Sequence, residues 1–441
     1  MSGVGHPSLE SPLQINEVEI RNRLYRAPLL ECAGNGPDAV DRLIAALEPA
    51  AASGAGLIFQ GATIVRAEGG CAAPGMTRVH DPEFLARCER LTDRIADHDS
   101  RLFIQLEHGG LRSLETWHAA YRTRHPDLRQ LAVSRPPWQL RVLDRLGFLS
   151  FDVHVMSTNE VYELIADFGA AAEAAVAAGY DGIHLAGANM GMIEQFCSPL
   201  YNRREDEFGE DHDGPRPRFL HALYDEIRSR VGASTPIVTK VPAESAAPPI
   251  VRRRLSLDDG VELAATCAEI GYDAVVPVIG SGFWDGSIVR GEYPARAWKS
   301  EQFRAGYDQA FGGPLRRRLV SIGNRIQAYH LGFEPAWNAE FCRRVRRRVT
   351  IPVLAEGGIR SREQIDQLLA QETCDMVGLG RPFYAEPRLP ARLLSKHDAS
   401  VICSNCNNCT VPQVTGADGV CRTPAVLQRH GELVTEGAYD E

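Results

Sequence analysis

Four cysteines near the end of the chain have a spacing that indicates metal chemistry. Cys403, Cys406 and Cys409 form a C-x2-C-x2-C run, and Cys421 follows after eleven intervening residues. Clustered thiolates bind soft metal centres, so we predict that these four side chains ligate one centre. By residue type alone that centre is a [4Fe–4S] cluster or a structural zinc ion. The other seven cysteines are scattered and are predicted to pack as small apolar residues.

Two glycine-ended apolar runs predict a phosphate site. Ile351–Ala355 leads into Gly357-Gly358, and Met376–Leu379 leads directly into Gly380-Arg381. Glycine lets backbone N–H groups approach an anion closely, and a following helix N-terminus adds a favourable dipole. In (β/α)8 barrels the loops after the seventh and eighth strands commonly form such a site. Ordinary turns of a doubly wound sheet would give the same pattern, so the motif alone leaves both interpretations open.

Apolar runs alternate with helical patterns along most of the chain. This alternation predicts a parallel α/β sheet and, with about eight units, a closed (β/α)8 TIM barrel. The expected strands lie within residues 18–28 and at residues 57–59, 102–106, 181–186, 236–241, 273–278, 351–355 and 376–379. The expected helices lie at residues 40–52, 82–98, 157–178, 218–231 and 258–270, and one more begins at the capping-box pair Ser361 and Gln364.

The same pattern predicts the domain organisation. Residues 1–11 are expected to form an N-terminal tail, 12–398 the barrel, 399–425 a short cysteine-rich segment that binds the metal centre, and 426–441 a C-terminal tail. Two segments of the barrel, about 111–156 and 280–337, are too long for plain connections. We expect them to be functional or partly helical.

Composition narrows the class of protein. The net charge of −9 argues against a general binder of nucleic acid or of anionic membranes. The first twenty residues lack a basic, apolar leader, and no apolar run approaches membrane-spanning length. Eleven cysteines without a secretion signal are typical of a reducing compartment. We therefore expect a cytoplasmic protein that binds neither nucleic acid nor membranes.

The predicted strand ends carry motifs that resemble a known family. These motifs are RNRLYRAP at 21–28, GLIFQGATIV at 56–65, IQLEHG at 104–109, QFCSPLYNRREDEFG at 195–209 and the stretch 356–387. Their types and order resemble old yellow enzymes, and more narrowly the NADH:flavin oxidoreductase and 2,4-dienoyl-CoA reductase branch. The resemblance covers roughly residues 12–421. It implies a TIM barrel with non-covalently bound FMN over the C-terminal ends of the strands.

The resemblance also assigns cofactor contacts. Gln105 matches an amide that pairs with the flavin pyrimidine edge, and Lys240 matches a cation near the flavin N1 and C2 carbonyl. Such a cation favours the anionic reduced flavin. Leu30 stands where the family usually has a Thr or Cys that tunes the flavin potential. The remaining positions match backbone contacts to the flavin ring or its phosphate and are Ala27, Pro28, Ala62, Gly357, Gly358, Gly380 and Arg381.

The substrate side departs from the family pattern. Family members usually carry a His and a His or Asn that hold the substrate carbonyl, and a Tyr that protonates the substrate carbon. Here Ala186 replaces the first His, Asn189 keeps the second polar position, and Gly191 replaces the Tyr. His184 lies one pleat deeper and is expected to be an interior histidine rather than a substitute. We therefore expect a non-standard pocket, with weak activity on small cyclic enones and a preference for bulkier substrates.

Another proton donor must then serve. The candidates are Tyr201, His108, a residue of the segment 280–337, or solvent.

The resemblance implies an activity and partners. We expect an FMN-dependent oxidoreductase that takes hydride from NAD(P)H or another donor, including a redox partner protein, and reduces an activated C=C of a small molecule. The alternatives are oxidation of a C–H donor as in amine dehydrogenases, or an electron-transfer subunit. The four cysteines fall where cluster-bearing relatives keep theirs, which favours [4Fe–4S] over zinc. A homo-oligomer is also expected.

Overall fold

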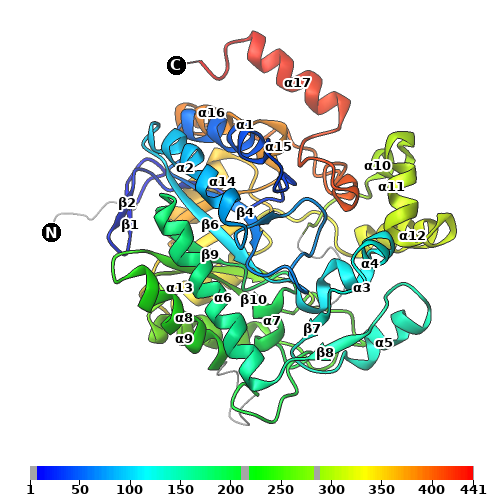
Figure 1. Cartoon of the computed structure of the whole chain (residues 1–441). Helices are drawn as coiled ribbons and strands as arrows, with labels where there is room; N and C mark the ends of the chain where they lie inside the picture. The colour runs from blue at the N-terminus through cyan, green and yellow to red at the C-terminus, as the bar shows by residue number, and fades with distance from the viewer. Residues whose placement is uncertain (1–6, 210–217, 283–288, 441) are drawn as a thin grey trace.

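The chain forms a closed barrel of parallel strands (Figure 1). The computed structural model describes residues 7–209, 218–282 and 289–440. A parallel bridge between Val275 and Val353 joins the two outermost strands of the sheet and closes it. In spatial order the barrel strands are β3 (Leu24–Arg26), β4 (Leu57–Ile64), β6 (Arg101–Glu107), β9 (Gly182–Leu185), β10 (Ile237–Ala243), β11 (Ala274–Ile279), β12 (Leu354–Glu356) and β13 (Met376–Leu379).

A helix follows each barrel strand and covers the outside. These helices are α1 (Ala39–Ala52), α2 (Pro82–Ala96), α6 (Thr158–Ala177), α8 (Arg218–Val231), α9 (Leu257–Ile270), α13 (Ala339–Arg346), α14 (Arg362–Ala370) and α16 (Leu389–Ser395). The predicted (β/α)8 TIM barrel is therefore confirmed. The predicted strand 351–355 is shorter than expected, because β12 begins only at Leu354.

Capping explains where two of these helices begin. Ser157 and Glu160 form a complete capping box at α6. At α14 the Ser361 hydroxyl accepts from the Gln364 N–H at 3.2 Å, but the Gln364 side chain accepts from the Arg360 N–H at 2.8 Å. Only half of the predicted capping box is therefore formed there.

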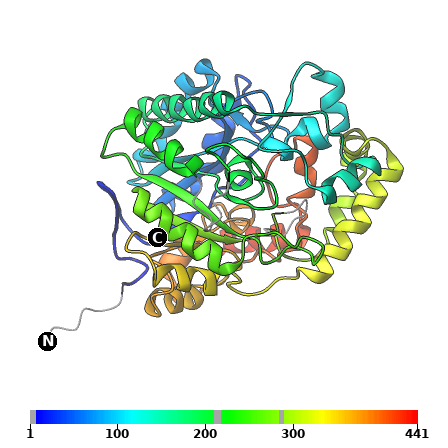
Figure 2. The same cartoon turned by 90° about the horizontal axis from the view of Figure 1, so that it is seen from below.

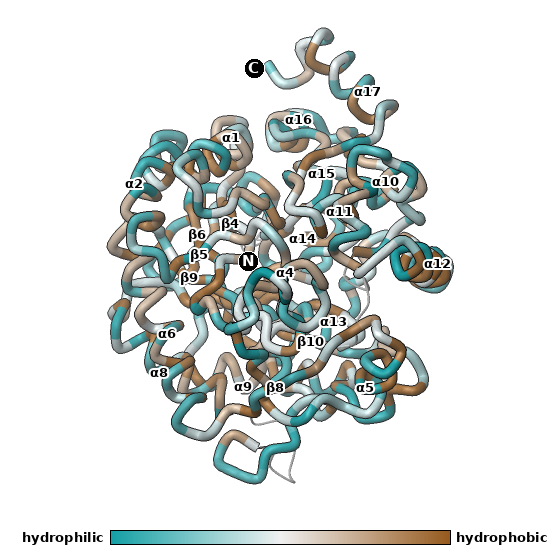
Figure 3. The backbone as a smooth tube through the Cα atoms, turned by 45° about the vertical axis from the view of Figure 1, so that its right-hand side comes forward, coloured by the Kyte–Doolittle hydropathy of each residue, from teal (hydrophilic) through white to brown (hydrophobic). Residues whose placement is uncertain are grey.

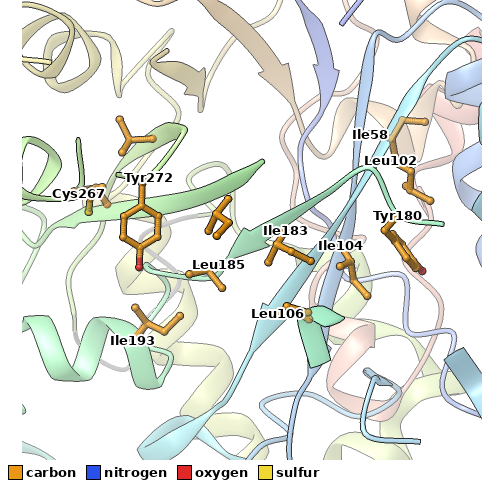
Figure 4. Packing of buried hydrophobic residues seen from close by; sticks show 14 of the residues in the cluster. Ile58, Leu102, Ile104, Leu106, Tyr180, Ile183, Leu185, Ile193, Cys267 and Tyr272 are labelled. Carbon is orange, nitrogen blue, oxygen red and sulfur yellow. The ribbon is translucent and has the colours of Figure 1, made fainter. Parts of the chain in front are cut away.

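Strand alternation separates an inner from an outer apolar layer. Ile58, Leu102, Ile104 and Ile183 face outward into the core between strands and helices (Figure 4). Their neighbours point into the barrel, where Phe59, Phe103, Val238, Val276, Leu354 and Met376 pack together. The hairpin of β1 (Leu13–Ile15) and β2 (Val18–Ile20) adds Ile15 and Ile20 to this inner layer. The lower barrel is thus filled with apolar side chains, and the inward Gln105, Lys240 and Glu356 lie toward the strand C-termini.

Both long connections fold over the barrel and contain regular elements (Figure 2). β5 (Thr77–Arg78) adds a short strand beside β4. After β6 come η1 (Gly110–Arg112), α3 (Leu114–Trp117), α4 (Ala119–Arg124), β7 (Gln130–Ala132), α5 (Trp138–Arg145) and β8 (Val153–Val155), and α7 (Met192–Cys197) follows β9. After β11 come α10 (Ala295–Lys299), α11 (Glu301–Phe311) and α12 (Pro314–His330).

The terminal segments are more ordered than tails. α15 (Pro382–Ala385) precedes the cysteine-rich segment, which contains η2 (Val411–Thr415), and α17 (Pro424–Thr435) follows it. Beyond α17, the Tyr439 hydroxyl donates to the buried Glu386 carboxylate at 2.9 Å. At the other end, Leu9 is fully buried in the main core. Leu9 and the residues around Tyr439 therefore pack against the barrel. No helix among the described residues is long and apolar enough to span a membrane.

Candidate active site

Strand β6 places two polar side chains at the barrel mouth, which is the end of the barrel formed by the C-termini of its strands. Phe103 lies in the inner layer, so strand alternation directs Gln105 and Glu107 inward as well. Both side chains are buried, with Glu107 only 5% exposed. Sequence reasoning found Gln105 but missed Glu107. Strand alternation could have identified Glu107, because it lies two residues after Gln105 and therefore on the same face of the strand.

His184 lies inside the barrel below the mouth. Its Nδ1 accepts from the Gln105 amide at 3.2 Å, and its ring stacks on Phe59 with 4.3 Å between ring centroids. Complete burial holds the pKa of His184 well below its usual value of 6.5. The imidazole is therefore neutral, and its Nε2 has no hydrogen-bond partner among the described residues. Its role in this arrangement is to orient the Gln105 amide.

A buried ion pair crosses the mouth from β10 to β12. Lys240 follows the inward Val238 by two residues, and its ammonium group contacts the Glu356 carboxylate. The two side chains are 6% and 13% exposed. The second carboxylate oxygen of Glu356 is buried and unpartnered within the described residues. Sequence reasoning identified Lys240 but missed Glu356, which is 116 positions away in the chain.

The Glu107 carboxyl occupies the space beside Gly191. A Cβ atom placed on Gly191 would lie 3.5 Å from Oε1 of Glu107. Burial raises the pKa of Glu107, and the nearby Arg112 and Lys240 oppose this rise only in part. Among the described residues its side chain makes no hydrogen bond or salt bridge. A buried carboxyl group with a raised pKa therefore faces the side-chain position that Gly191 leaves empty.

The other predicted proton donors are occupied. His108 is fully buried, its Nε2 donates to the Glu68 carbonyl at 3.0 Å, and its Nδ1 accepts from the Gly110 N–H at 3.2 Å. Burial lowers the pKa of His108 from 6.5 to about 4, so the ring is neutral. The Tyr201 hydroxyl donates to the Gly282 carbonyl. Much of the segment 280–337 is described, but residues 283–288 lie outside the described part of the chain.

Asn189 lies in the turn after β9, away from the inner ring of polar groups. Its backbone is left-handed with φ of 79°, and its carbonyl accepts from the Arg112 guanidinium. Asparagine tolerates this conformation better than most residues, which accounts for its place in the turn.

The two predicted phosphate loops follow the neighbouring strands β12 and β13. Gly357 and Gly358 have φ of 106° and 74°, the left-handed conformation that favours glycine. A Cβ on Gly358 would lie 2.4 Å from the Glu334 carbonyl, so the segment before α13 packs tightly against this turn. Gly380 is more open, since a Cβ there would meet only a Leu29 methyl group at 3.2 Å and the Ala27 Cβ at 4.0 Å.

Arg381 turns from the phosphate loops toward the cysteine-rich segment. Its guanidinium donates to the Asn407 side chain and, at 2.6 Å, to the carbonyl of Arg290. The side chain therefore links the end of β13 to the residues between Cys406 and Cys409.

The predicted ring-contact residues surround the same mouth. The Ala27 N–H donates to the Leu379 carbonyl at 2.9 Å, and the segment from Ala27 to Leu30 then runs past Gly61 and Ala62. A Cβ on Gly61 would overlap the Leu29 carbonyl at 1.4 Å, so the two backbones touch. Pro28 is partly exposed in this segment, and the Leu30 carbonyl accepts from Tyr384 and Gln413. An inward amide, an inward cation and the open position at Gly380 thus fit FMN.

The four predicted metal ligands converge in one place. Cys403, Cys406, Cys409 and Cys421 all line one cavity of about 20 Å³ beside Arg381 and Tyr384. Asn405 and Asn407 have φ of 54° and 57°, and these left-handed turns direct the three closely spaced thiols to one side. No three His, Cys, Asp or Glu side chains among the described residues are close enough to hold a single metal ion.

Two family profiles and several known proteins match this chain. The profile of the NADH:flavin oxidoreductase / NADH oxidase family matches residues 8–278, and that of dihydrouridine synthase matches residues 332–421. A metal reductase of Desulforamulus reducens is 26% identical over 96% of this chain and 54% of that protein. An NADH oxidase of Thermoanaerobacter brockii is 25% identical over 94% of this chain and 57% of that protein. The chain thus spans about half the length of these two relatives.

Other matches are of similar length to this chain or are known structures. A 4,4'-dithiodibutanoate disulfide reductase of Rhodococcus erythropolis is 25% identical over 97% of this chain and 98% of that protein. A structure of 2-naphthoyl-CoA reductase superposes with a TM-score of 0.72 at 17% identity, covering 98% of this chain and 58% of that one. An old yellow enzyme homologue from Zymomonas mobilis gives a TM-score of 0.64 at 18% identity over 96% and 99% of the two chains. The chain belongs to the NADH:flavin oxidoreductase / NADH oxidase family, as its motifs predicted.

Proposed function

We propose that this protein is an FMN-dependent oxidoreductase that takes hydride from NAD(P)H and reduces a C=C bond activated by a neighbouring carbonyl. The observation that carries the proposal is the set of inward side chains Gln105, Lys240 and Glu107 above a filled barrel core. FMN, when bound, accepts hydride from the donor and delivers it to the substrate.

The residues of the mouth have separate tasks. Gln105, held by His184, offers both a donor and an acceptor to the pyrimidine edge of the flavin. Lys240 stabilises negative charge at the same edge, and Glu356 reduces the net charge that Lys240 presents. Gly380 leaves room for the phosphate, because a Cβ there would meet only Leu29 and Ala27, and Gly358 permits the tight left-handed turn beside it.

Glu107 is the proposed proton source. Hydride addition to one carbon of an activated C=C leaves a carbanion equivalent, and an acid must protonate the neighbouring carbon. His108 and Tyr201 already donate to backbone carbonyls, and Lys240 is paired with Glu356. Glu107 is buried and free of hydrogen bonds within the described residues, and burial raises its pKa, which favours the acid form. Its proton moves to the substrate carbon, and solvent then restores it.

We also propose a [4Fe–4S] cluster on Cys403, Cys406, Cys409 and Cys421. The four cysteines line one cavity, and a C-x2-C-x2-C run with a fourth cysteine is typical of an iron–sulfur cluster. Arg381 supports electron exchange, because it connects the end of β13, beside the proposed phosphate site, to Asn407 within the cysteine run.

The test is anaerobic purification followed by separate half-reactions. The purified protein should show a flavin spectrum, contain iron rather than zinc, and be reduced by NADH or NADPH. The reduced protein should then be reoxidised by an α,β-unsaturated carbonyl compound under anaerobic conditions. A protein that stays colourless after reconstitution with FMN would contradict the proposal.

One observation keeps a second function in consideration. The contact between Arg381 and Asn407 would equally serve a subunit that passes electrons between its flavin and a partner protein. If the protein is such an electron-transfer subunit, neither a nicotinamide nor an unsaturated carbonyl compound would exchange electrons with the flavin directly. Oxidation of an amine is less well supported, because the nearby Lys240 and Arg112 do not favour a cationic substrate.

A further inference from the structure

Helix α12 has its polar side toward the protein and its apolar side toward solvent. On the inner side the Ser321 hydroxyl bonds with Tyr293 at 2.7 Å, Asn324 accepts from the Trp298 indole at 3.0 Å, and Arg317 pairs with Asp308 at 3.4 Å. None of the α12 residues, all of which the structure describes, is buried. An amphipathic surface helix ordinarily buries its apolar face, so this arrangement is inverted.

The apolar side chains form one continuous stripe. Leu315, Leu319, Ile322, Ile326 and Tyr329 are 71%, 44%, 47%, 56% and 86% exposed. Five neighbouring side chains exposed to this extent form a patch of a few hundred Å², a size that often marks an interaction site. α12 lies at the outer edge of the molecule (Figures 1 and 3). The exposed fractions show that no other described residue covers the stripe.

The spacing of the stripe indicates what covers it. The five positions are separated by four, three, four and three residues, which is the heptad a/d pattern of a helix–helix seam. A helix that lies on a membrane presents a wider apolar face than this narrow seam. We propose that the stripe pairs with the α12 helix of a second copy of this chain, in parallel, about a two-fold axis.

The charged edges of the seam decide the direction of pairing. Arg318 and Arg325 occupy the g positions, whereas Arg316, Gly323 and His330 occupy the e positions. In an antiparallel pair the g positions face each other, which would place Arg318 against Arg325. In a parallel pair Arg318 and Arg325 face Gly323 and His330 of the second copy, and Arg316 faces no residue of α12, so the repulsion is avoided.

The geometry at the centre also suits a second helix. A Cβ on Gly323 would meet no other atom within 4 Å, so a helix can approach closely there. A standard interface buries about 800 Å² on each partner, and the stripe would form its apolar centre. An isologous pair uses the same patch on both copies, which one stripe can supply.

The first experiment measures the mass in solution. The parent protein should have the mass of a dimer by light scattering, and Leu319→Glu combined with Ile326→Glu should give a monomer. Leu427→Glu on α17, where the leucine is 46% exposed, is the matched control and should stay dimeric. Because α12 buries no apolar side chain in the monomer, the double variant should keep its circular dichroism and its thermal unfolding as a folded monomer.

The second experiment determines the direction. In a parallel pair, Leu315→Cys should cross-link to the same residue of the second copy under mild oxidation, whereas the parent should not cross-link. In an antiparallel pair, Leu315→Cys would cross-link only when combined with Tyr329→Cys, and this result would overturn the parallel arrangement. A parent monomer, a dimer that survives both glutamates, or a monomer that binds anionic phosphatidylglycerol vesicles through α12 would overturn the proposal as a whole.

Discussion

At the scale of single residues, the chemistry of the mouth depends on which groups are already partnered. Glu107 stands apart because it is buried, inward-facing and free of hydrogen bonds among the described residues. Lys240, His184 and Tyr201 each already contact a neighbour. Whether a side chain already has a hydrogen-bond or ion-pair partner depends on the folded structure. The sequence alone therefore led to Tyr201 and His108 as proton donors and not to Glu107.

Glu107→Gln should separate the two half-reactions. Reduction of the flavin by NAD(P)H should stay close to the parent rate, because no proton is needed from Glu107 in that step. Reoxidation by an unsaturated carbonyl compound should slow by about 10²–10⁴, the usual contribution of a positioned acid. Stopped-flow absorbance of the flavin measures both steps.

The control and the pH dependence sharpen this test. Glu107→Asp keeps an acid and should recover part of the reoxidation rate. Because burial raises the pKa of Glu107, the parent rate should be highest at low pH and fall as pH rises through that value, and the glutamine variant should lack this fall. Infrared spectra should also show a protonated carboxyl band in the parent that the variant loses. Equal slowing of both half-reactions would refute the assignment.

Glu356→Gln should make the flavin easier to reduce. The change leaves Lys240 near the proposed flavin without its compensating carboxylate. We expect the two-electron potential to rise by about 30 mV, which corresponds to ~1.4 kcal/mol. Spectroscopic redox titration measures this shift, and an unchanged or lower potential would contradict the position of Lys240 beside the flavin.

At the scale of elements, the regular pattern of the barrel was predictable and its contacts were not. Helix α8 and strand β13 have the predicted bounds because periodicity and capping are local signals. The pairing of Lys240 with Glu356 joins β10 to β12, and no local signal reports such a contact. The inverted face of α12 was also missed, since its polar side bonds to residues of neighbouring segments.

The Gly357-Gly358 turn should be the element most sensitive to a single methyl group. Gly358→Ala places a Cβ 2.4 Å from the Glu334 carbonyl at a φ of 74°, so both backbone strain and a clash oppose it. We expect a loss of about 1–3 kcal/mol in unfolding free energy and weaker retention of FMN. The matched control is Gly232→Ala, at a φ of 78° with no atom within 4 Å, which carries the strain without the clash. Equal effects of the two changes would show that contact with Glu334 is unimportant.

The loop after β6 should make stability depend on pH. Burial lowers the pKa of His108 to about 4, whereas in the unfolded chain it returns to about 6.5. The unfolded state therefore binds the proton first as pH falls, and stability present above pH 6.5 is lost progressively toward pH 4. Between pH 7 and 5 the loss from this group is about 2 kcal/mol. Urea unfolding of His108→Gln at both pH values should show a smaller loss than the parent.

At the scale of the whole molecule, two proposed cofactor sites share one end of the chain. β12 and β13 supply the phosphate loops, and the cysteine-rich segment follows directly after α16. The Arg290 carbonyl accepts from Arg381, and the Glu292 N–H donates to the Asn405 carbonyl at 2.9 Å. The long connection after β11 therefore touches both sites, and the flavin and the cluster are expected to be coupled.

This arrangement predicts what loss of the cluster does to the rest of the protein. Cys406→Ser removes one of four thiolates and should abolish most bound iron. The barrel core does not include Cys406, so FMN should stay bound, and NAD(P)H should still reduce it. Electron transfer from the reduced flavin to a one-electron acceptor such as ferricyanide should slow, because the cluster offers the route toward the surface.

Buried Cys374 supplies the control for that experiment. It lies in the main core, far along the chain from the cysteine run, so Cys374→Ser should lower thermal stability while leaving iron content per folded protein unchanged. Iron analysis, flavin absorbance and anaerobic reduction of both variants distinguish the two outcomes. Iron retained by Cys406→Ser, or zinc found in the parent in its place, would mean that the four cysteines do not hold an iron–sulfur cluster.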